Sequence, residues 1–372
     1  MRRAAIIGRV FPERVLTAVS DNDRALAEHL RVLLARNLIR YYRLEGEQGK
    51  AYIFNHPLTH EATYSGILLD ERRRLHCRVL QEMERLYAGN LDVHYATLAR
   101  HAYLGQLWDK AVYYLHLAGD RAKAAYALPE AVRYYQRAMG LIQEQRLSLS
   151  RERLADLYGE CCIAQSQLGD YAAARTVCNV LMEMGERLHD PYLRGHALHG
   201  AALIAAHTGD VVAQVASARA ACREFEMAEA DCSRGAAALI LALGMIKCRE
   251  MEQARATVEE GLRLAGSDRC RSRRDLYSEA LHCAGLISLA CGQTEEALSR
   301  LAESEERARR AGEHILIGLS LAASGMAHGL RGDYRRALQQ AEKAGRVGRS
   351  AEIPLVVSIS SACEAWLCAM AG

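Results

Sequence analysis

The stretch LGDYAAARTV, residues 168–177, contains the pattern that decides the fold. The same Gly-Asp-Tyr-x-x-Ala pattern returns in LRGDYRRALQQA, residues 330–341. CGQTEEALSRLAE (291–303) keeps the glycine and the alanine, while TGDVVAQVASA (208–218) and CREMEQARATV (248–258) each depart at one position. The turn positions recur at a nearly constant step of about 40 residues, slightly longer before the fourth, at Gly169, Gly209, Arg249, Gly292 and Gly332.

The chemistry of this unit predicts a helical hairpin. Glycine ends one helix because it adopts positive φ without a steric penalty. The polar residue that follows can cap the next helix, and the alanine lets two helices approach closely. One hairpin cannot bury its own apolar face, so neighbouring hairpins must stack into a solenoid.

A closely related pattern begins earlier in the chain. In the segment LGQLWDKAVYYLHLAGDRA (104–122), Gly105, Trp108 and Ala111 align with the repeat unit. The next segment, ALPEAVRYYQRAMGLI (127–142), places Ala131 at the position equivalent to Ala111 after only half the usual spacing. This short step suggests that one hairpin shares a helix with the next. Together these motifs resemble the tetratricopeptide (TPR) family, in a variant whose period is longer than usual, over the region from near residue 90 to residue 372. The predicted turn and packing positions are Gly105, Trp108, Ala111, Gly169, Tyr171, Ala174, Gly209, Ala254, Gly292, Ala297, Gly332, Tyr334 and Ala337.

Composition excludes several functional classes. Lys and Arg number 48 against 45 Asp and Glu, so a net charge of +3 gives no general argument for binding nucleic acid or an anionic membrane. No uncharged apolar stretch is long enough to span a bilayer, and the apolar run near the N-terminus is too short for a signal peptide. The twelve cysteines form no C-x-x-C pair, so we expect small buried side chains in a reducing cytoplasm and no zinc site.

Residues 1–70 lack the repeat and predict a different module. Helices are expected over 12–19 and 20–39, and a β-hairpin is expected from RYYRLE and AYIFNH around GEQG. Pro57 then opens a helix, with Asn55 or His56 as its cap. This order is typical of a winged helix. We therefore predict an all-α chain in which a small winged-helix-like module with one β-hairpin (1–70) precedes a TPR-like α-solenoid (71–372).

Four segments carry a more specific resemblance: AAIIGRVFPERVLTAV, LLARNLIRYY, YIFNHPLTHEATYSGIL and RRRLHCRVLQEMERLY. In order and spacing they are similar to the region after the ATPase core in AAA/STAND-type signalling ATPases. The closest similarity is to those fused to class III adenylate/guanylate cyclase domains. The resemblance implies a regulatory role, with His56 facing a nucleotide held by the ATPase, and a protein or peptide partner along the solenoid.

The catalytic motifs of those relatives are not found in the sequence. It contains no G-x-x-x-x-G-K-[ST] motif, because its only Gly-Lys pair, Gly49-Lys50, is followed by Ala51, and no cyclase-like carboxylate pair can be located. We therefore expect a non-enzymatic chain without a cofactor that senses signals for an ATPase or cyclase module. Two alternatives remain: part of a STAND-type transcription regulator, or a fragment of an adenylate cyclase-type enzyme.

Several local patterns favour structural roles over chemical ones. A metal site is not expected at His56 and His60, because no third ligand lies at helical spacing from them. A solvated helix is expected to start at Arg72, Arg73 and Arg74. Residues 1–76 hold 13 Lys and Arg against 9 Asp and Glu, a small excess for a DNA-binding module. We expect packing by at least one residue of each pair Tyr113/Tyr114 and Tyr134/Tyr135, and mainly packing by His196, His199 and His207. The arginine-rich stretch 266–277 predicts a lengthened loop.

The C-terminal sequence predicts a solenoid that ends on half a hairpin. One further period beyond Gly332 reaches Gly372, so VVSISSACEAWLCAMAG (356–372) supplies a first helix without its partner. We expect Trp366, Leu367 and Met370 to lie on an open end, as in a fragment of a longer array or an end that a partner or a second copy of the chain covers.

Overall fold

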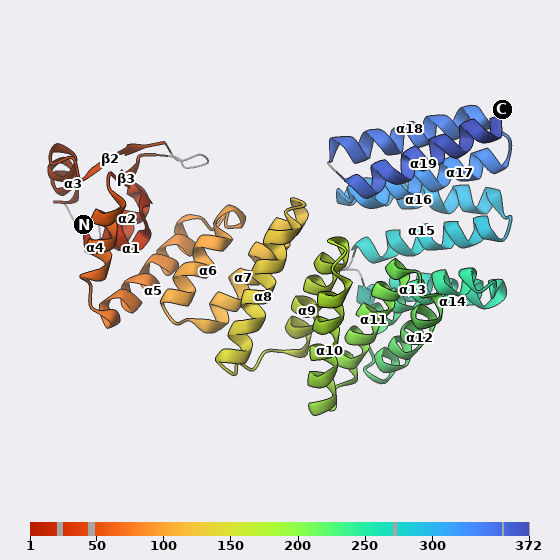
Figure 1. Cartoon of the computed structure of the whole chain (residues 1–372), viewed down its shortest axis with the longest axis horizontal. Coiled ribbons are helices and arrows are strands. Elements are labelled where there is room, and N and C mark those ends of the chain that lie inside the picture. Colours follow the sequence, from red (N-terminus) through yellow and green to blue (C-terminus); the bar gives the residue numbers. More distant parts are fainter. Residues whose placement is uncertain (21–24, 44–48, 271–273, 352, 372) are drawn as a thin grey trace. The chain divides into compact units, whose positions relative to one another are not determined.

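The computed structural model describes residues 1–20, 25–43, 49–270, 274–351 and 353–371. The chain divides into two compact units, Met1–Ser148 and Leu149–Gly372 (Figure 1). The predicted domain boundary at residue 70 lies inside the first unit and stays a prediction.

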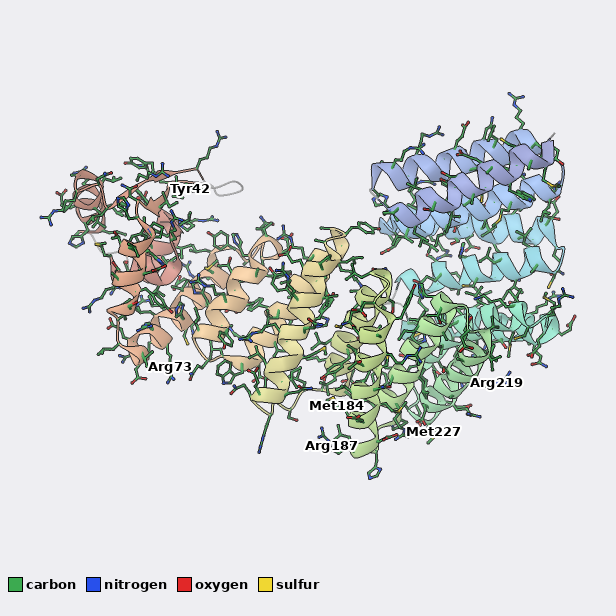
Figure 2. The ribbon with its side chains drawn as sticks, in the orientation of Figure 1. Tyr42, Arg73, Met184, Arg187, Arg219 and Met227 are labelled. Atoms are coloured by element: carbon green, nitrogen blue, oxygen red, sulfur yellow. A yellow bond between two sulfur atoms is a disulfide. The ribbon has the colours of Figure 1, made fainter. Side chains whose placement is uncertain are left out.

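The first unit begins with short helices around a three-stranded antiparallel sheet. The strand order is β1-β3-β2, and β3 pairs with both neighbours through Val10 opposite Ile53 and Ile39 opposite Phe54. β3 is buried along its whole length, whereas Tyr42 of the edge strand β2 is 41% exposed (Figure 2). The elements are α1 (Arg2–Ile7), β1 (Val10–Pro12), α2 (Glu13–Val19), α3 (Leu26–Ala35), β2 (Ile39–Tyr42), β3 (Ala51–Phe54) and α4 (Pro57–Ser65).

The structure confirms the predicted hairpin and corrects the elements around it. α2 lies where a helix was expected, but α3 ends at Ala35 because Asn37 adopts a φ of 54° and the chain turns into β2. α1 and β1 were not predicted. The expected helix start at Asp21 and most of the GEQG turn lie outside the described residues. His56 occupies the predicted N-cap of α4, although its side chain makes no capping hydrogen bond.

The remainder of the first unit is a run of helices. α7 packs against both α6 and α8, as the inner helices of the second unit also pack against both of their neighbours, so the helix sharing expected from the short motif step stays a prediction. Ala111 and Ala131 are both fully buried at the starts of α7 and α8. The helices are α5 (Leu69–Leu86), α6 (Tyr95–Leu104), α7 (Trp108–Ala124) and α8 (Leu128–Glu144), with a 3-10 turn η1 (Asp92–His94) before α6.

The second unit is a stack of antiparallel helical hairpins. The first helices of successive hairpins, from α9 to α19 in odd numbers, also contact one another. A short 3-10 turn, η2 (Asp268–Cys270), lies in the predicted long loop, whose residues 271–273 lie outside the described part. The helices are α9 (Arg151–Gln167), α10 (Tyr171–Arg187), α11 (Pro191–Thr208), α12 (Val211–Met227), α13 (Asp231–Lys247), α14 (Met251–Ala265), α15 (Arg274–Ala290), α16 (Thr294–Ala311), α17 (His314–Leu330), α18 (Tyr334–Ser350) and α19 (Pro354–Ala371).

The turns of the second unit have the predicted geometry. All five aligned positions adopt positive φ, from 61° at Arg249 to 80° at Gly209. Where aspartate follows the glycine, at Asp170, Asp210 and Asp333, its carboxylate accepts a hydrogen bond from the backbone N–H three residues on. The sequence alignment of the turn positions is wrong at Gly105 in the first unit. Gly105 stays in the right-handed helical region, and the next residue, Gln106, adopts the positive φ of 57°. Gly105 is instead needed for close packing, since a Cβ there would lie 2.9 Å from Cys77 Sγ.

Two of these turns provide a matched test of backbone strain. We expect Gly209→Ala to lower the free energy of unfolding by about 1 kcal/mol, because an L side chain is strained at this φ. A Cβ at Gly209 meets no atom within 4 Å, so the backbone alone determines the loss. Arg249→Gly should raise stability by roughly 0.5 kcal/mol, because it relieves the same strain. Urea titration of each variant measures both changes, and a loss of stability in both variants would contradict the explanation.

One repeat replaces the packing alanine with a polar side chain. Ala174, Ala254, Ala297 and Ala337 are fully buried in the slot five residues after the turn, and Gln214 fills this slot after Gly209. The Gln214 amide donates to the Ile240 carbonyl at 3.0 Å and accepts from Lys247 Nζ at 3.1 Å. Gly244 makes room for both Val215 and Gln214, since a Cβ there would lie 2.8 Å from Val215 Cγ2 and 3.3 Å from the Gln214 amide.

The cysteines only partly follow the sequence expectation. Cys232 and Cys270 form a disulfide, which departs from the expectation of small buried cysteine side chains in a reducing environment. Nothing in their spacing along the chain marks this pair, because the fold brings α13 and η2 together. Seven of the free cysteines are buried or half-buried, and the exposed ones are Cys248, Cys291 and Cys368.

The last helix packs more fully than the sequence suggests. Leu367 is 3% exposed and Trp366 is half-buried against the core formed by α17 and α18, close to Gly329. These two residues therefore do not form the predicted open surface, whereas Met370 is 52% exposed. Within the described part of the chain, no helix is both long and apolar enough to cross a membrane.

Candidate functional site

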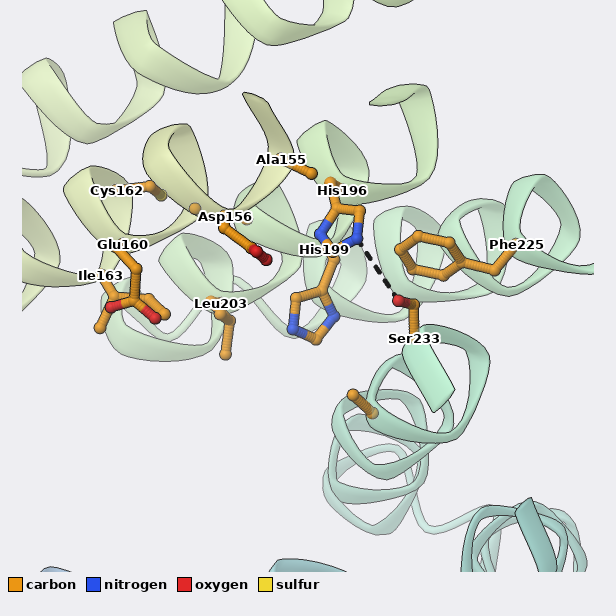
Figure 3. Close-up of a pocket in the computed structure, with 13 residues that line it drawn as sticks. Ala155, Asp156, Glu160, Cys162, Ile163, His196, His199, Leu203, Phe225 and Ser233 are labelled. Atoms are coloured by element: carbon orange, nitrogen blue, oxygen red, sulfur yellow. Dashed lines mark hydrogen bonds between the residues drawn. The ribbon is translucent and has the colours of Figure 1, made fainter. Parts of the chain in front are cut away.

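A pocket of about 90 Å³ lies on the first helices of three successive hairpins in the second unit (Figure 3). α9, α11 and α13 form its walls, and Phe225 reaches it from α12. Its volume suits one side chain of a ligand. Its lining residues are Ala155, Asp156, Gly159, Glu160, Cys162, Ile163, His196, His199, Gly200, Leu203, Phe225, Ser233 and Ala236.

Helical periodicity brings the polar groups of the pocket together. Asp156, Glu160 and Ile163 are spaced by four and three residues, so they share one face of α9. His196, His199 and Leu203 follow a similar spacing on α11. One wall therefore presents two carboxylates and the opposite wall presents two imidazoles, with an aliphatic side chain at one end of each.

An aromatic cluster holds the α11 wall in place. The ring of Phe225 is 1% exposed and lies edge-on to the His196 ring, with 5.0 Å between centroids. Gly195 permits this contact, because a Cβ there would lie 2.7 Å from the Phe225 ring. His196 also packs edge-on to Tyr192 at 4.6 Å, and its Nε2 lies 3.4 Å from Ser233 Oγ. The imidazole of His196 is thus fixed by contacts from three helices.

The arrangement suits binding better than bond chemistry. Ser233 Oγ lies 3.4 Å from His196 Nε2, which is longer than the roughly 2.6–3.2 Å expected between a serine nucleophile and its general base. No group of three or more potential metal ligands gathers anywhere in the described residues. Carboxylates, imidazoles and an aromatic ring around a small space can instead orient a polar or positively charged group beside apolar contacts.

A second polar cluster is buried inside the first unit. The Nδ1 atoms of His76 on α5 and His101 on α6 lie 2.9 Å apart, and the Tyr64 hydroxyl lies 3.0 Å from His76 Nε2. Both imidazoles are fully buried. Burial lowers the pKa of His76 to about 4 and that of His101 to about 3, with a further contribution from the nearby Arg100 charge. Both histidines are therefore neutral at pH 7 and serve packing.

The other residues identified from the sequence lie apart from the pocket. His56 is exposed, and His60 Nε2 donates to the Ala5 carbonyl at 3.0 Å, so the two do not form a common site. Arg72 donates to the Ile67 and Ser65 carbonyls and braces the start of α5, whereas Arg73 is exposed and pairs with Asp70 at 3.6 Å. The predicted TPR positions are turns and packing contacts, and none of them lines the pocket.

The structure confirms that the tyrosine pairs contribute to packing, but it does not place all three histidines in the core. Tyr114 and Tyr135 are buried while Tyr113 is 48% exposed, which confirms that one tyrosine of each pair packs. His207 is exposed and donates to the Leu203 carbonyl at 2.7 Å. His196 and His199 combine packing with a place in the pocket wall, which the sequence interpretation missed. The repeat period was the available signal, since Asp156, His196 and Ala236 follow one another at the same step as the turns.

Comparison with known proteins supports the fold. No protein-family model and no curated protein matches the chain. The structure is similar to that of a Rap protein complexed with Competence and Sporulation Factor, with a TM-score of 0.53 and 12% identity over 81% of this chain and 87% of the other. It also aligns with NprR in complex with its cognate peptide NprX (TM-score 0.49, 15% identity, 96% of each chain).

A further alignment is with a STAND protein that has a tetratricopeptide repeat sensor, from Pyrococcus horikoshii. The TM-score is 0.48 at 12% identity, and the alignment covers all of this chain but 60% of that protein's length. The helical hairpins and the similarity to Rap define the chain as an all-α, TPR-like solenoid.

Proposed function

We propose that this chain is a non-catalytic protein-interaction and signal-sensing region whose second unit binds an extended peptide or protein segment across α9, α11 and α13. The observation that carries the proposal is the pocket, which draws its walls from three successive hairpins. A chain lying across them would contact all three, as expected of a repeat protein. The Rap protein of similar fold was solved with Competence and Sporulation Factor, so a bound signal is compatible with this architecture.

The charges in the pocket define the expected ligand. Asp156 and Glu160 favour a positively charged group near α9, and Ile163, Leu203 and Phe225 favour an apolar side chain beside it. Charge-assisted hydrogen bonds to a carboxylate in a recessed site are among the stronger polar contacts. We therefore expect the best ligands to combine a basic residue with apolar neighbours.

Selection from a displayed library of random peptides tests the proposal. We expect the wild-type chain to enrich basic-apolar peptides, and Glu160→Lys to weaken their binding at least tenfold by reversing the charge in the pocket. The matched control is Glu183→Lys on α10, which reverses an exposed charge outside the pocket and should leave affinity unchanged. If the wild type and Glu160→Lys enrich basic-apolar peptides equally, the peptides bind outside this pocket.

For the wider role, we propose that the chain regulates an ATPase or cyclase module. The order α1-β1-α2-α3-β2-β3 supports a winged-helix interpretation of the N-terminal residues. His56 is exposed at the start of α4, where it could contact such a module. The alternative is that the chain is part of a STAND-type transcription regulator with a TPR sensor. DNA binding by a longer protein that contains this chain would favour that alternative.

Absence of enzymatic turnover is a separate expectation. Purified residues 1–372 should not hydrolyse ATP, because the sequence contains no phosphate-binding P-loop, and should not form cyclic AMP, because no cyclase-like carboxylate pair can be located in it. A radiolabelled-nucleotide assay is sensitive enough to decide this. Turnover that co-purifies with the chain and persists after a second chromatographic step would make it an enzyme and overturn the proposal.

A further inference from the structure

Two thiols meet inside the first hairpin of the second unit. Cys162 lies on α9 and Cys178 on α10, on opposite sides of the turn at Gly169. Their Sγ atoms are 3.3 Å apart, and the two residues are only 2% and 6% exposed. The separation is shorter than that expected of two unrelated packed sulfurs and corresponds to a thiol–thiol hydrogen bond.

The neighbouring hairpin leaves space for this pair. Gly200 of α11 faces it, and a Cβ at this position would lie 2.7 Å from Cys178 Sγ and 3.3 Å from Cys162 Sγ. Cys162 also lines the pocket described above, opposite His199 and Leu203 on α11 (Figure 3). The pocket therefore gives a small solute a route to one member of an otherwise buried pair.

The two thiols are chemically different. The hydrogen bond between the two thiols lowers the pKa of Cys162 despite its burial and raises the pKa of Cys178. Cys162, which is also the member that faces the pocket, is thus the better nucleophile. The adjacent Cys161 differs, because burial raises the pKa of its thiol to about 12.

We propose that Cys162 and Cys178 are a site of reversible oxidation, at which a hydroperoxide joins α9 to α10 through an intramolecular disulfide in the wall of the pocket. The Cys162 thiolate attacks one peroxide oxygen, so that an S–O bond forms, the O–O bond breaks and the leaving oxygen departs as water or an alcohol after protonation. The Cys178 sulfur then attacks Cys162, the S–S bond forms, the S–O bond breaks and a water leaves.

The electrons balance without a further reactant. The two thiols lose two electrons in total, which reduce the hydroperoxide, and a dithiol reductant reverses the reaction by thiol–disulfide exchange. A disulfide requires about 2.05 Å between sulfurs, so the two Sγ atoms must approach by roughly 1 Å or more. Because Cys162 lines the pocket, this movement changes the pocket's wall. The effect on ligand binding rests on the proposed function, whereas the oxidation does not.

Peptide mapping tests the oxidation directly. The full chain is treated with hydrogen peroxide, its remaining thiols are alkylated, and the digest is read by mass spectrometry. We expect a cross-linked peptide that joins Cys162 to Cys178 and disappears with dithiothreitol. In Cys178→Ser the intermediate should persist as a sulfenic acid on Cys162, which dimedone traps. Cys161→Ser is the matched control, and it should leave the cross-link unchanged.

Three results would overturn the proposal. One is complete alkylation of Cys162 and Cys178 under conditions that oxidise the exposed Cys248 and Cys291. Another is a cross-link of Cys162 to Cys161 instead of Cys178. The third is a cross-link between different chains, which a concentration series on non-reducing gels reveals. None of these readouts needs a peptide ligand, so they are independent of whether the proposed function holds.

The regulatory consequence has its own readout. Peptides enriched by the reduced chain are titrated against the oxidised chain, with Cys178→Ser as the variant that cannot form the disulfide. We expect oxidation to weaken binding to the wild type and to leave Cys178→Ser unaffected. A cross-link without a change in affinity would exclude regulation of the pocket. Failure of the reduced chain to enrich any peptide would instead contradict the proposed function.

Discussion

Replacing Tyr135 with alanine will lower the free energy of unfolding of the first unit by roughly 3–5 kcal/mol. The ring of Tyr135 is fully buried on α8 and lies against Gly119 of α7, where a Cβ would come within 2.4 Å of it. Its hydroxyl donates to Asp120 at 2.8 Å. The substitution therefore removes buried apolar surface and leaves a cavity between two helices that pack closely because one of them carries a glycine.

The fluorescence of Trp108 reports this loss. The chain contains two tryptophans, so Trp366→Phe leaves a single reporter within the first unit. The matched control is Tyr113→Ala on α7, which removes a ring that is 48% exposed and should cost much less. Equal urea midpoints for Tyr135→Ala and Tyr113→Ala would show that burial of Tyr135 does not stabilise the unit.

Acidification from pH 7 to pH 4 will destabilise the first unit by an amount on the order of 3 kcal/mol or more. The pKa values of His76 and His101 in the folded chain, about 4 and about 3, lie below the value of 6.5 expected when unfolded. At pH values between the folded and the unfolded pKa, the unfolded chain binds more protons than the folded chain. Stability is therefore fully present above about pH 6.5 and falls as the pH drops through this window.

The two imidazoles can be removed as a pair. His76→Leu with His101→Leu places an apolar side chain of similar size at both positions, so the pH dependence should flatten and neither imidazole is left facing a missing partner. The Tyr64 hydroxyl loses its contact with His76. His56→Ala, which removes an exposed histidine, should keep the wild-type slope. Trp108 must again be the reporter, because burial also lowers the pKa of His282 in the second unit to about 4. An unchanged slope in the double variant would contradict this assignment.

Local patterns explain which parts of the fold could be predicted from the sequence. The turns at Gly169 and Gly332 were found because glycine and aspartate act within a few residues of their own positions. Even Arg249 could be placed, since the period fixes the frame when the residue type does not. Gly105 was misassigned because close helix packing and positive φ both select glycine, and the sequence alone does not distinguish these causes.

Features that depend on distant contacts could not be predicted in the same way. α1 and β1 are short, and β1 is held by pairing with β3, which lies beyond three intervening elements in the chain. The contact between His76 and His101 joins two helices whose side-chain directions are unknown until they pack. The disulfide between Cys232 and Cys270 has the same origin.

The pocket is an intermediate case. Its residues on α9 and α11 repeat with the same step as the turns, so the period predicts that Asp156 and His196 occupy equivalent places. What the period does not reveal is that Phe225 enters from α12 or that Gly195 makes room for it. Those two details decide that a recess forms between the helices.

The buried Gln214 also bears on how such an array could be rearranged. Hairpins that meet through alanine alone are interchangeable, because duplication or deletion of a whole unit presents the same surface to each neighbour. The α11–α12 hairpin is different, since Gln214 needs the Ile240 carbonyl, Lys247 and the space beside Gly244, all on α13. Moving this hairpin elsewhere would bury an amide without its partners. We therefore expect the α11–α12 and α13–α14 hairpins to be copied or lost together, because separating them would leave the Gln214 amide buried without its partners.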